Sequence, residues 1–194
     1  MIIGITGGTG SGKTTLLKLI EAHGGRILDC DAIYHELLRT DWALLEQIEA
    51  AFPGTVEDGV LDRKKLGAIV FADEEKLLQL NNITHSAVKT EVLKHLDGAL
   101  VAIDAIGLFE GGLAPLCDVT VAVTAPLDMR IARLMQRDGI SEDYARSRIN
   151  AQHDESWYRE RCEHILENSG ELEDFTAICL AFLHNLGIIK TTTE

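Results

Sequence analysis

The residues best suited to chemistry stand near the start of the chain, in a glycine-rich run that ends in lysine and threonine. The run reads Gly7-Gly8-Thr9-Gly10-Ser11-Gly12-Lys13-Thr14. Its spacing, a glycine, four free positions and then Gly-Lys-Ser/Thr, is that of a loop that wraps a polyphosphate. Glycines let backbone N–H groups point at phosphate oxygens, Lys13 would reach the β- and γ-phosphates, and the Thr14 hydroxyl would contact Mg²⁺. We expect this loop to bind a nucleoside triphosphate.

The residues on either side of the loop favour this interpretation over a chance glycine-rich turn. An apolar strand pattern over residues 1–5 precedes the loop, and a helical pattern with Leu16, Leu17 and Ile20 follows it up to Gly24-Gly25. A helix that begins at the loop directs the positive end of its dipole at the bound anion.

Apolar runs typical of buried strands alternate with helical patterns along the chain. We predict strands at 1–5, 26–29, 100–104, 119–123 and 163–166. Such an alternation indicates a three-layer α/β fold, with a parallel sheet of about five strands between helices. Residues 32–99 carry no strong strand signal, and turns at Pro53-Gly54 and Asp58-Gly59 interrupt their amphipathic patterns. We expect a helical insertion there.

Length, charge and cysteine content restrict the class of protein. The 194 residues suit one domain, and a net charge of −13 disfavours nucleic acid and anionic membranes as partners. The N-terminus does not resemble a signal peptide, and no apolar run approaches the roughly 18 residues that span a bilayer. The four cysteines are widely spaced and form no metal pattern, as expected of buried residues in a reducing cytosol. We therefore expect a cytoplasmic protein.

Two aspartates, Asp29 and Asp31, stand at the end of the second predicted strand. Strand alternation would direct both carboxylates to one side, at the sheet edge where α/β proteins bind ligands. One of them would then accept a proton from an attacking hydroxyl or orient it. The alternative is that an aspartate caps a helix that starts at Ala32.

Further acids follow the third predicted strand. Asp104 ends the apolar run 100–104, where a carboxylate would hold Mg²⁺ directly or through water. Glu110 lies among Gly107, Gly111 and Gly112, in a loop flexible enough to approach a ligand. For both residues a purely structural or solvated role is an equal alternative.

Five arginines within nineteen residues reverse the local charge of an acidic protein: Arg130, Arg133, Arg137, Arg146 and Arg148. The first three fall at i, i+3 and i+7, on one face of a helix that ends near Gly139, and Ser141 can start a second helix. A basic helical hairpin would act as a lid whose guanidinium groups stabilise the transferring phosphoryl group. We expect at most two of the five to be catalytic. The alternative is ion pairing with Asp128, Glu142 and Asp143.

Two further types of polar residue need an interpretation. The amide of Asn168, after the last predicted strand, would bond an adenine edge or else form an Asx turn. The histidines His35, His85 and His153 are isolated in the sequence, which favours structural or exposed roles over metal binding.

Taken in order, these residues resemble the dephospho-coenzyme A kinase family over nearly the whole chain. The resembling segments are Thr6 to Thr15, Asp29-Cys30-Asp31 (Asp-Ala-Asp in the family), 71–88 with His85, Leu108-Phe109-Glu110, the lid residues Arg137, Arg148 and Gln152, and Asn168-Ser169-Gly170. The resemblance implies a P-loop kinase domain over 1–194, with an acceptor-binding insertion at about 32–99 and a lid at about 130–158.

The resemblance also implies a reaction, in which ATP with Mg²⁺ phosphorylates the ribose 3′-hydroxyl of dephospho-coenzyme A. Asp31 would be the base, Lys13 and Arg137 would stabilise charge, and Thr14 and Asp104 would hold the metal. The expected ATP-binding residues are Gly8, Gly10, Ser11, Gly12, Lys13, Thr14, Thr15 and Asn168. The expected acceptor-binding residues are Asp31, His85, Glu110 and Arg148. The expected partner is this small molecule, and a monomer is expected although the chain carries no signal of oligomeric state.

Departures from the family pattern concern the acceptor. The family's His-Pro is His85-Ser86 here, its Pro-Leu-Leu is Ile106-Gly107-Leu108, and a common arginine is His35. A related kinase of nucleosides or nucleotides is therefore the alternative. A non-catalytic nucleotide switch is less favoured, because it does not explain an arginine-rich lid beside a carboxylate pair, and the chain has no Asn-Lys-x-Asp motif for guanine.

Overall fold

The structure, a computed structural model, describes residues 1–189 and divides into two compact units. The first, here the phosphate-loop unit, consists of Met1–Ile27, Gly98–Leu108 and the chain from Ala114 onward. The second, here the helical unit, consists of Leu28–Asp97 and Phe109–Leu113. The chain therefore passes from the first unit into the second and back twice.

A five-stranded sheet in the order β2-β5-β1-β6-β7 forms the framework of the fold. The pairs β1–β5, β1–β6 and β6–β7 are parallel. The strands are β1 (Ile2–Thr6), β2 (Arg26–Asp29), β5 (Val101–Asp104), β6 (Val119–Thr124) and β7 (His164–Glu167). Every predicted strand is present and agrees with the sequence patterns to within one residue at either end. The predicted α/β fold with a parallel sheet is confirmed.

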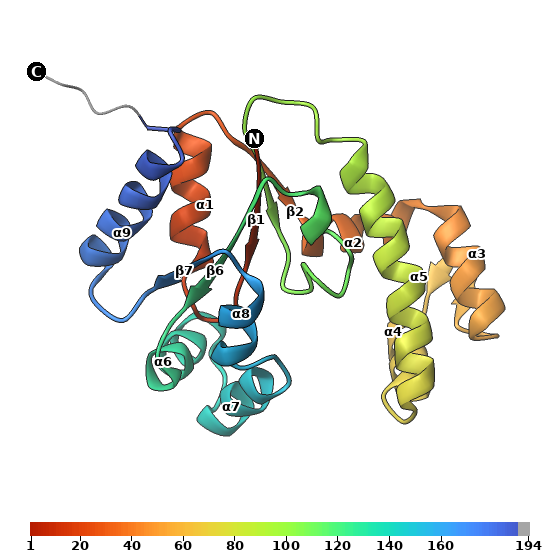
Figure 1. Cartoon of the computed structure of the whole chain (residues 1–194). Coiled ribbons are helices and arrows are strands. Elements are labelled where there is room, and N and C mark those ends of the chain that lie inside the picture. Colours follow the sequence, from red (N-terminus) through yellow and green to blue (C-terminus); the bar gives the residue numbers. More distant parts are fainter. Residues whose placement is uncertain (190–194) are drawn as a thin grey trace, which may run out of the picture. The chain divides into compact units, whose positions relative to one another are not determined.

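Apolar side chains of the central strands and of two helices form the main core of the phosphate-loop unit. All six residues of β6 are buried, which explains why this strand reads as a continuous apolar and β-branched run. Helices α1 (Lys13–Ala22) and α9 (Leu172–Asn185) lie against each other (Figure 1). Leu16 and Ile20 of α1 belong to the same core cluster as Phe175 and Leu183 of α9.

The predicted helical hairpin over the arginine cluster is present in the phosphate-loop unit. Helices α6 (Leu127–Asp138) and α7 (Glu142–Asn150) pack through a small apolar cluster of Ile131, Leu134, Ala145 and Ile149. Gly139 ends α6 at a φ of 64°, a left-handed conformation that favours glycine. A short 3₁₀ helix (Ala114–Leu116) and α8 (Glu155–Arg161) complete the described elements of this unit.

Four helices and a small hairpin make up the helical unit. The helices are α2 (Cys30–Thr40), α3 (Trp42–Ala51), α4 (Arg63–Val70) and α5 (Glu74–Leu93). The hairpin pairs β3 (Val56–Glu57) with β4 (Val60–Leu61) in antiparallel fashion, which the sequence patterns did not predict. Asp58 and Gly59 form its tip at φ values of 52° and 76°, the backbone of a tight two-residue turn.

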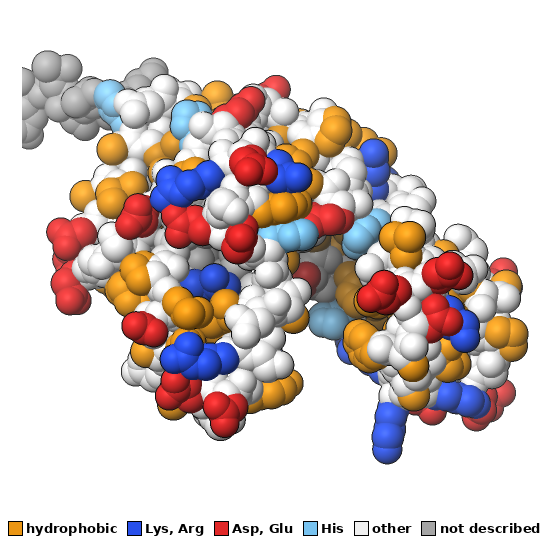
Figure 2. All heavy atoms as spheres, turned by 60° about the horizontal axis from the view of Figure 1, so that its bottom comes forward, with side chains coloured by type: hydrophobic (Ala, Val, Ile, Leu, Met, Phe, Trp, Pro, Cys, Tyr) orange, Lys and Arg blue, Asp and Glu red, His pale blue; other side chains and the backbone are white. Residues whose placement is uncertain are grey.

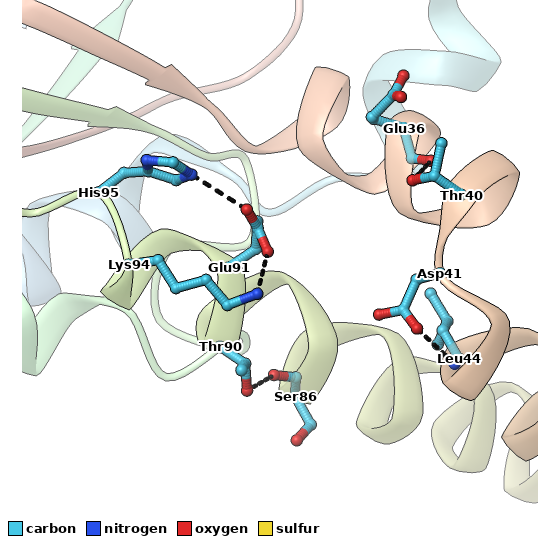
Figure 3. Close-up of polar contacts among 9 residues, drawn as sticks. All are labelled: Glu36, Thr40, Asp41, Leu44, Ser86, Thr90, Glu91, Lys94 and His95. Atoms are coloured by element: carbon cyan, nitrogen blue, oxygen red, sulfur yellow. Dashed lines mark hydrogen bonds and ion pairs between the residues drawn. The ribbon is translucent and has the colours of Figure 1, made fainter.

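Aspartates start the helices of this unit, and a carboxylate organises the end of α5. Asp41 caps α3 by accepting a hydrogen bond from the Leu44 N–H (Figure 3). Glu91 accepts hydrogen bonds from Lys94 and His95, and both bonds lower the pKa of Glu91 (Figure 3). The bond between Lys94 and Glu91 also raises the pKa of Lys94. The Asp41 cap stabilises the start of α3, and the Glu91 contacts join neighbouring side chains at the end of α5.

All four cysteines lie within the described residues and are thiols. Cys30 and Cys179 are buried as expected, whereas Cys117 and Cys162 are only half-buried. Burial raises the pKa of Cys179 to about 12, so this thiol stays protonated and acts as a small apolar side chain. Among residues 1–189 we find no helix with the length and apolar character needed to cross a membrane. Figure 2 shows Lys and Arg side chains interspersed with Asp and Glu on the face that it displays.

Candidate active site

The phosphate loop joins the end of β1 to the start of α1, and two of its glycines have no room for a side chain. Gly7 has a φ of 130°, and a Cβ there would lie 2.2 Å from the Val123 carbonyl oxygen. Gly12 has a φ of 102°, and a Cβ there would lie 2.2 Å from the Asn168 side-chain nitrogen. The loop conformation therefore requires glycine at both positions.

Lys13 and Thr14 form the start of α1, where the loop ends. The Lys13 ammonium group donates to the Gly7 carbonyl across the loop, with an N···O distance of 2.8 Å, and the Thr14 side chain is exposed. No side chain caps the N-terminus of α1, so the helix presents backbone N–H groups together with the Lys13 charge. This arrangement suits the phosphates of a nucleoside triphosphate.

Asp104 ends β5 beside the phosphate loop. In the parallel pairing of β1 with β5, Asp104 lies opposite Ile5, two residues before the loop begins, and it is half-buried. Within residues 1–189 we find no group of three or more His, Cys, Asp or Glu side chains that would hold a metal by themselves. Mg²⁺ in kinases uses phosphate oxygens, water and only one or two protein oxygens, so the Asp104 carboxylate and the Thr14 hydroxyl fit that requirement.

Two of the five clustered arginines bond directly to the phosphate loop. Arg130 Nε donates to the Thr9 carbonyl at 2.9 Å, and burial lowers the pKa of its guanidinium. Arg133 donates to the Gly10 and Ser11 carbonyls at 3.3 and 3.4 Å. The sequence patterns placed both residues in the lid but did not predict these contacts, because their partners are more than 120 residues away.

The other three arginines form ion pairs with acids of the hairpin. Arg137 and Arg148 both donate to Asp138, with N···O distances of 2.6 Å, and Arg146 pairs with Glu142. The hydrogen bond from Arg137, and to a smaller extent the one from Arg148, lowers the pKa of Asp138 to about 2. The Arg137–Asp138 hydrogen bond also raises the pKa of Arg137. The alternative of ion pairing is thus partly confirmed, with Asp138 as the acid that was not foreseen. The catalytic role of Arg137 stays a prediction.

Asn168 follows β7 and is buried against the loop. Its Nδ2 donates to the Ser11 carbonyl at 2.8 Å, and its Oδ1 accepts from Arg133 at 3.1 Å. Its backbone N–H donates to the Thr124 carbonyl at 2.8 Å, which ties it to the end of β6. The side chain therefore bonds across the chain instead of closing a local turn. Its contact with adenine stays a prediction.

The two aspartates after β2 do not lie as strand alternation predicted. β2 ends at Asp29, whose side chain caps α2 by accepting from the Ala32 N–H at 2.9 Å. Asp31 lies in the first turn of α2 and is exposed. The prediction that alternation directs both carboxylates to one side is therefore wrong, because the helix begins at Cys30. The capping alternative is confirmed for Asp29, and Asp31 is left for another role.

Three of the predicted acceptor residues lie in the helical unit. Asp31 lies at the start of α2, half-buried His85 on α5, and exposed Glu110 in the segment Phe109–Leu113. The fourth, Arg148, belongs to the phosphate-loop unit. Their common role stays a prediction.

A pocket in the helical unit was missed from the sequence. It has a volume of about 140 Å³ and is lined mainly by apolar side chains of α2, β4, α4 and α5, with Tyr34 and Arg63 as the polar groups. Burial raises the pKa of Tyr34, so its phenol is a neutral hydrogen-bonding group. The Arg63 guanidinium also lies 3.4 Å from the ring of His35. The chain thus places an apolar pocket with one cation in the segment that was expected to hold the acceptor.

Comparisons with known proteins agree with the predicted resemblance. A family model described as dephospho-CoA kinase matches residues 1–174. The dephospho-CoA kinase of Bacillus licheniformis is 37% identical over 185 residues, which cover 91% of this chain and 92% of that protein. The dephospho-CoA kinase of Thermus thermophilus is 38% identical over 189 residues, with coverages of 96% and 92%.

Solved structures give the same result. A Thermus thermophilus protein, TT1252, superposes with a TM-score of 0.78 at 38% identity, covering 96% of this chain and 97% of that one. The dephospho-CoA kinase of Campylobacter jejuni superposes with a TM-score of 0.67 at 25% identity, with coverages of 95% and 96%. Shikimate kinase from Acinetobacter baumannii, at 18% identity and a TM-score of 0.53, shares the fold. On the strength of the family model and these relatives, the chain belongs to the dephospho-CoA kinase family.

Proposed function

We propose that this protein transfers the γ-phosphoryl group of ATP to the ribose 3′-hydroxyl of dephospho-coenzyme A, giving coenzyme A and ADP. Membership of the family makes it an ATP-dependent kinase of dephospho-coenzyme A. The observation that carries the proposal is the phosphate loop, across which Lys13 donates a hydrogen bond to the Gly7 carbonyl. The chain that contains this loop matches the family along almost its whole length. A kinase of nucleosides or nucleotides is not favoured by these relatives.

We assign a role in the reaction to each of the following residues. Lys13 would neutralise charge on the β- and γ-phosphates, and Arg137 would exchange Asp138 for phosphate oxygens as charge develops. Asp31 would accept the proton of the attacking hydroxyl. When bound, Mg²⁺ would be held by Thr14 and Asp104 and would neutralise phosphate charge. Phosphoryl transfer depends mainly on the positioning of the two substrates and on electrostatic stabilisation of the transferring phosphoryl group, and these residues would provide both.

We assign the acceptor to the helical unit, with His85, Glu110 and the pocket beside Arg63 as its contacts, and Arg148 from the lid. The apolar walls of the pocket suit the gem-dimethyl part of the acceptor's pantetheine arm, and Arg63 suits its diphosphate. The boundaries of the acceptor-binding insertion (32–99) and of the lid (130–158), a cytoplasmic location and a monomeric state stay predictions.

An acceptor panel tests the proposed function. With Mg·ATP, dephospho-coenzyme A should give coenzyme A, which carries the new phosphate on the ribose 3′-hydroxyl. Mass spectrometry of the cleaved product would show that the phosphate is on the ribose. Nucleosides and nucleoside monophosphates should show a kcat/KM at least about a hundredfold lower, because they lack the arm and the diphosphate that the helical unit would bind. A preference for one of these smaller acceptors would contradict the acceptor and leave the kinase activity standing.

Arg137→Ala should lower kcat more than it weakens ATP binding, by on the order of a hundredfold in kcat. The reason is that a lid arginine interacts most strongly when charge develops in the transition state. Steady-state kinetics and binding of a non-hydrolysable ATP analogue would separate the two effects.

Arg146→Ala is the matched control for this variant, since Arg146 is paired with Glu142 on the neighbouring helix of the same hairpin. Its kcat should stay within about twofold of the wild type. If Arg137→Ala reduces only ATP affinity, Arg137 is a binding residue, and if it changes neither quantity, the arginine belongs to a solvated face.

A further inference from the structure

Both backbone polar groups of Thr9, in the phosphate loop, are bonded by side chains from the lid segment: the N–H of the Gly8–Thr9 peptide and the carbonyl of the Thr9–Gly10 peptide. The Thr9 N–H donates to Gln152 Oε1 at 2.8 Å. The Thr9 carbonyl accepts from Arg130 Nε at 2.9 Å. Arg130 also donates to the same Gln152 oxygen at 3.3 Å, so Gln152, Arg130 and Thr9 form a closed three-membered network.

The two carbonyls that follow Thr9 are also held by side chains. Arg133 donates to the Gly10 and Ser11 carbonyls, and the Asn168 amide donates to the Ser11 carbonyl. The described chain has no cis peptide, and in a trans peptide the N–H points opposite to the carbonyl. Holding the carbonyls of residues 9, 10 and 11 therefore fixes the directions of the N–H groups of residues 10, 11 and 12. The Ser11 N–H donates to the Gly8 carbonyl at 3.2 Å, and the N–H groups of Gly10 and Gly12 are the ones that a phosphate would use.

Gln152 differs from the other members of this set in where it lies. It stands half-buried in the short connection between α7 and α8, where the arginine-rich hairpin ends, and it contacts a loop 143 residues earlier in the chain. Its one side-chain oxygen serves both the Thr9 N–H and Arg130. Without that oxygen the Thr9 N–H loses its bond to Gln152, and Arg130 keeps only the Thr9 carbonyl among the network's bonds.

We propose that Gln152 is a positioning residue for ATP: it acts through Arg130 and the two peptide groups on either side of the Thr9 Cα to hold the phosphate loop in the conformation that binds the triphosphate. It touches neither ATP nor the acceptor in this role. The inference rests on the proposed function at one point only, namely that the bound nucleotide is ATP. Arg130 accordingly acts on the loop carbonyl, and phosphate stabilisation is left to Lys13 and Arg137.

Replacement of Gln152 by methionine tests the proposal, because methionine has a similar length but no strong acceptor. Gln152→Met should weaken binding of a non-hydrolysable ATP analogue about tenfold. This is the size expected when the neutral bond to Thr9 and the charge-assisted bond to Arg130 are lost and only part of their energy affects ATP binding. The KM for the acceptor should stay within about twofold. Gln136→Met, a change at an exposed glutamine of α6, is the control and should bind the analogue as the wild type does.

Two further measurements separate positioning from general damage. The Thr9 amide should exchange hydrogen faster in Gln152→Met than in the wild type, while amides of the central strands keep their rates. Gln152→Glu keeps an acceptor oxygen opposite the Thr9 N–H and Arg130, so it should retain slow exchange at Thr9. Because Gln152 and Arg130 bond to each other and to the same residue, Thr9, Arg130→Met combined with Gln152→Met should weaken analogue binding no more than about twofold beyond the worse single variant.

The outcomes distinguish this inference from the proposed function. Wild-type analogue binding or unchanged Thr9 exchange in Gln152→Met would overturn the role of Gln152, as would fully additive losses in the double variant. Analogue binding and amide exchange need no acceptor. If the wild type does not phosphorylate dephospho-coenzyme A but these effects are found, the proposed function fails and the positioning role stands. If Gln152→Met does not fold, Arg130→Met carries the same comparison, because it removes the Arg130 bonds to Gln152 and to the Thr9 carbonyl.

Discussion

Lys13→Ala is expected to lower the rate of phosphoryl transfer on the order of a thousandfold. The Lys13 ammonium group lies over the loop, within 2.8 Å of the Gly7 carbonyl, at the N-terminus of α1. Charge that develops on the transferring group and on the ADP leaving group would lose its nearest cation, and the helix N-terminus alone supplies only partial charges. The rate should be measured at saturating ATP and acceptor, so that weaker ATP binding does not account for the loss.

Lys18→Ala is the matched control for this prediction. Lys18 lies on the same helix, it is exposed, and it is five residues from Lys13. Removal of its charge should change the rate by less than about twofold. Thermal unfolding of both variants should show that the fold is kept. A Lys13→Ala enzyme with more than a tenth of the wild-type rate would mean that Lys13 does not act on the phosphates.

The inner strands β1, β5 and β6 were predictable because they are buried on both faces. The run 119–123 can be recognised as a strand without alternating apolar and polar residues, because every residue of β6 is buried. The hairpin of β3 and β4 was missed for the opposite reason. Each strand has only two residues, and the one local signal, Asp58-Gly59, was interpreted as a simple turn.

The candidate site was predictable where neighbouring residues in the sequence are also neighbours in space. The phosphate loop is such a case, because its function depends on the backbone of eight consecutive residues. Asp29 and Asp31 were harder, because α2 begins at Cys30, two residues before the expected start at Ala32, and this difference decides whether Asp31 belongs to a strand or a helix. Periodicity identified the helix that carries Arg130 and Arg133 but not the carbonyls to which they donate. The resemblance placed Gln152 in the lid, but its bond to Thr9 was not predicted, since the two residues are 143 positions apart.

Asp31→Asn is expected to remove most of the activity with dephospho-coenzyme A, by about 10²- to 10⁴-fold in kcat, while ATP binding stays near that of the wild type. An amide has the shape of the carboxylate but cannot accept a proton from the 3′-hydroxyl. Asp31 is exposed in the first turn of α2, where Asn is tolerated, so a folding defect is not the expected cause of the loss. Product formation at saturating substrates and binding of a non-hydrolysable ATP analogue are the two measurements.

Asp29→Asn separates a role in the reaction from a role in the helix. Asp29 caps α2 through a 2.9 Å hydrogen bond from the Ala32 N–H, and asparagine caps helices about as well as aspartate. The variant should therefore keep kcat within a few-fold of the wild type and unfold at nearly the same temperature. If Asp29→Asn loses as much activity as Asp31→Asn, a negative charge at the start of α2 is needed in general and Asp31 is not the specific base. If Asp31→Asn keeps more than a tenth of the wild-type kcat, the proton leaves the hydroxyl by another route.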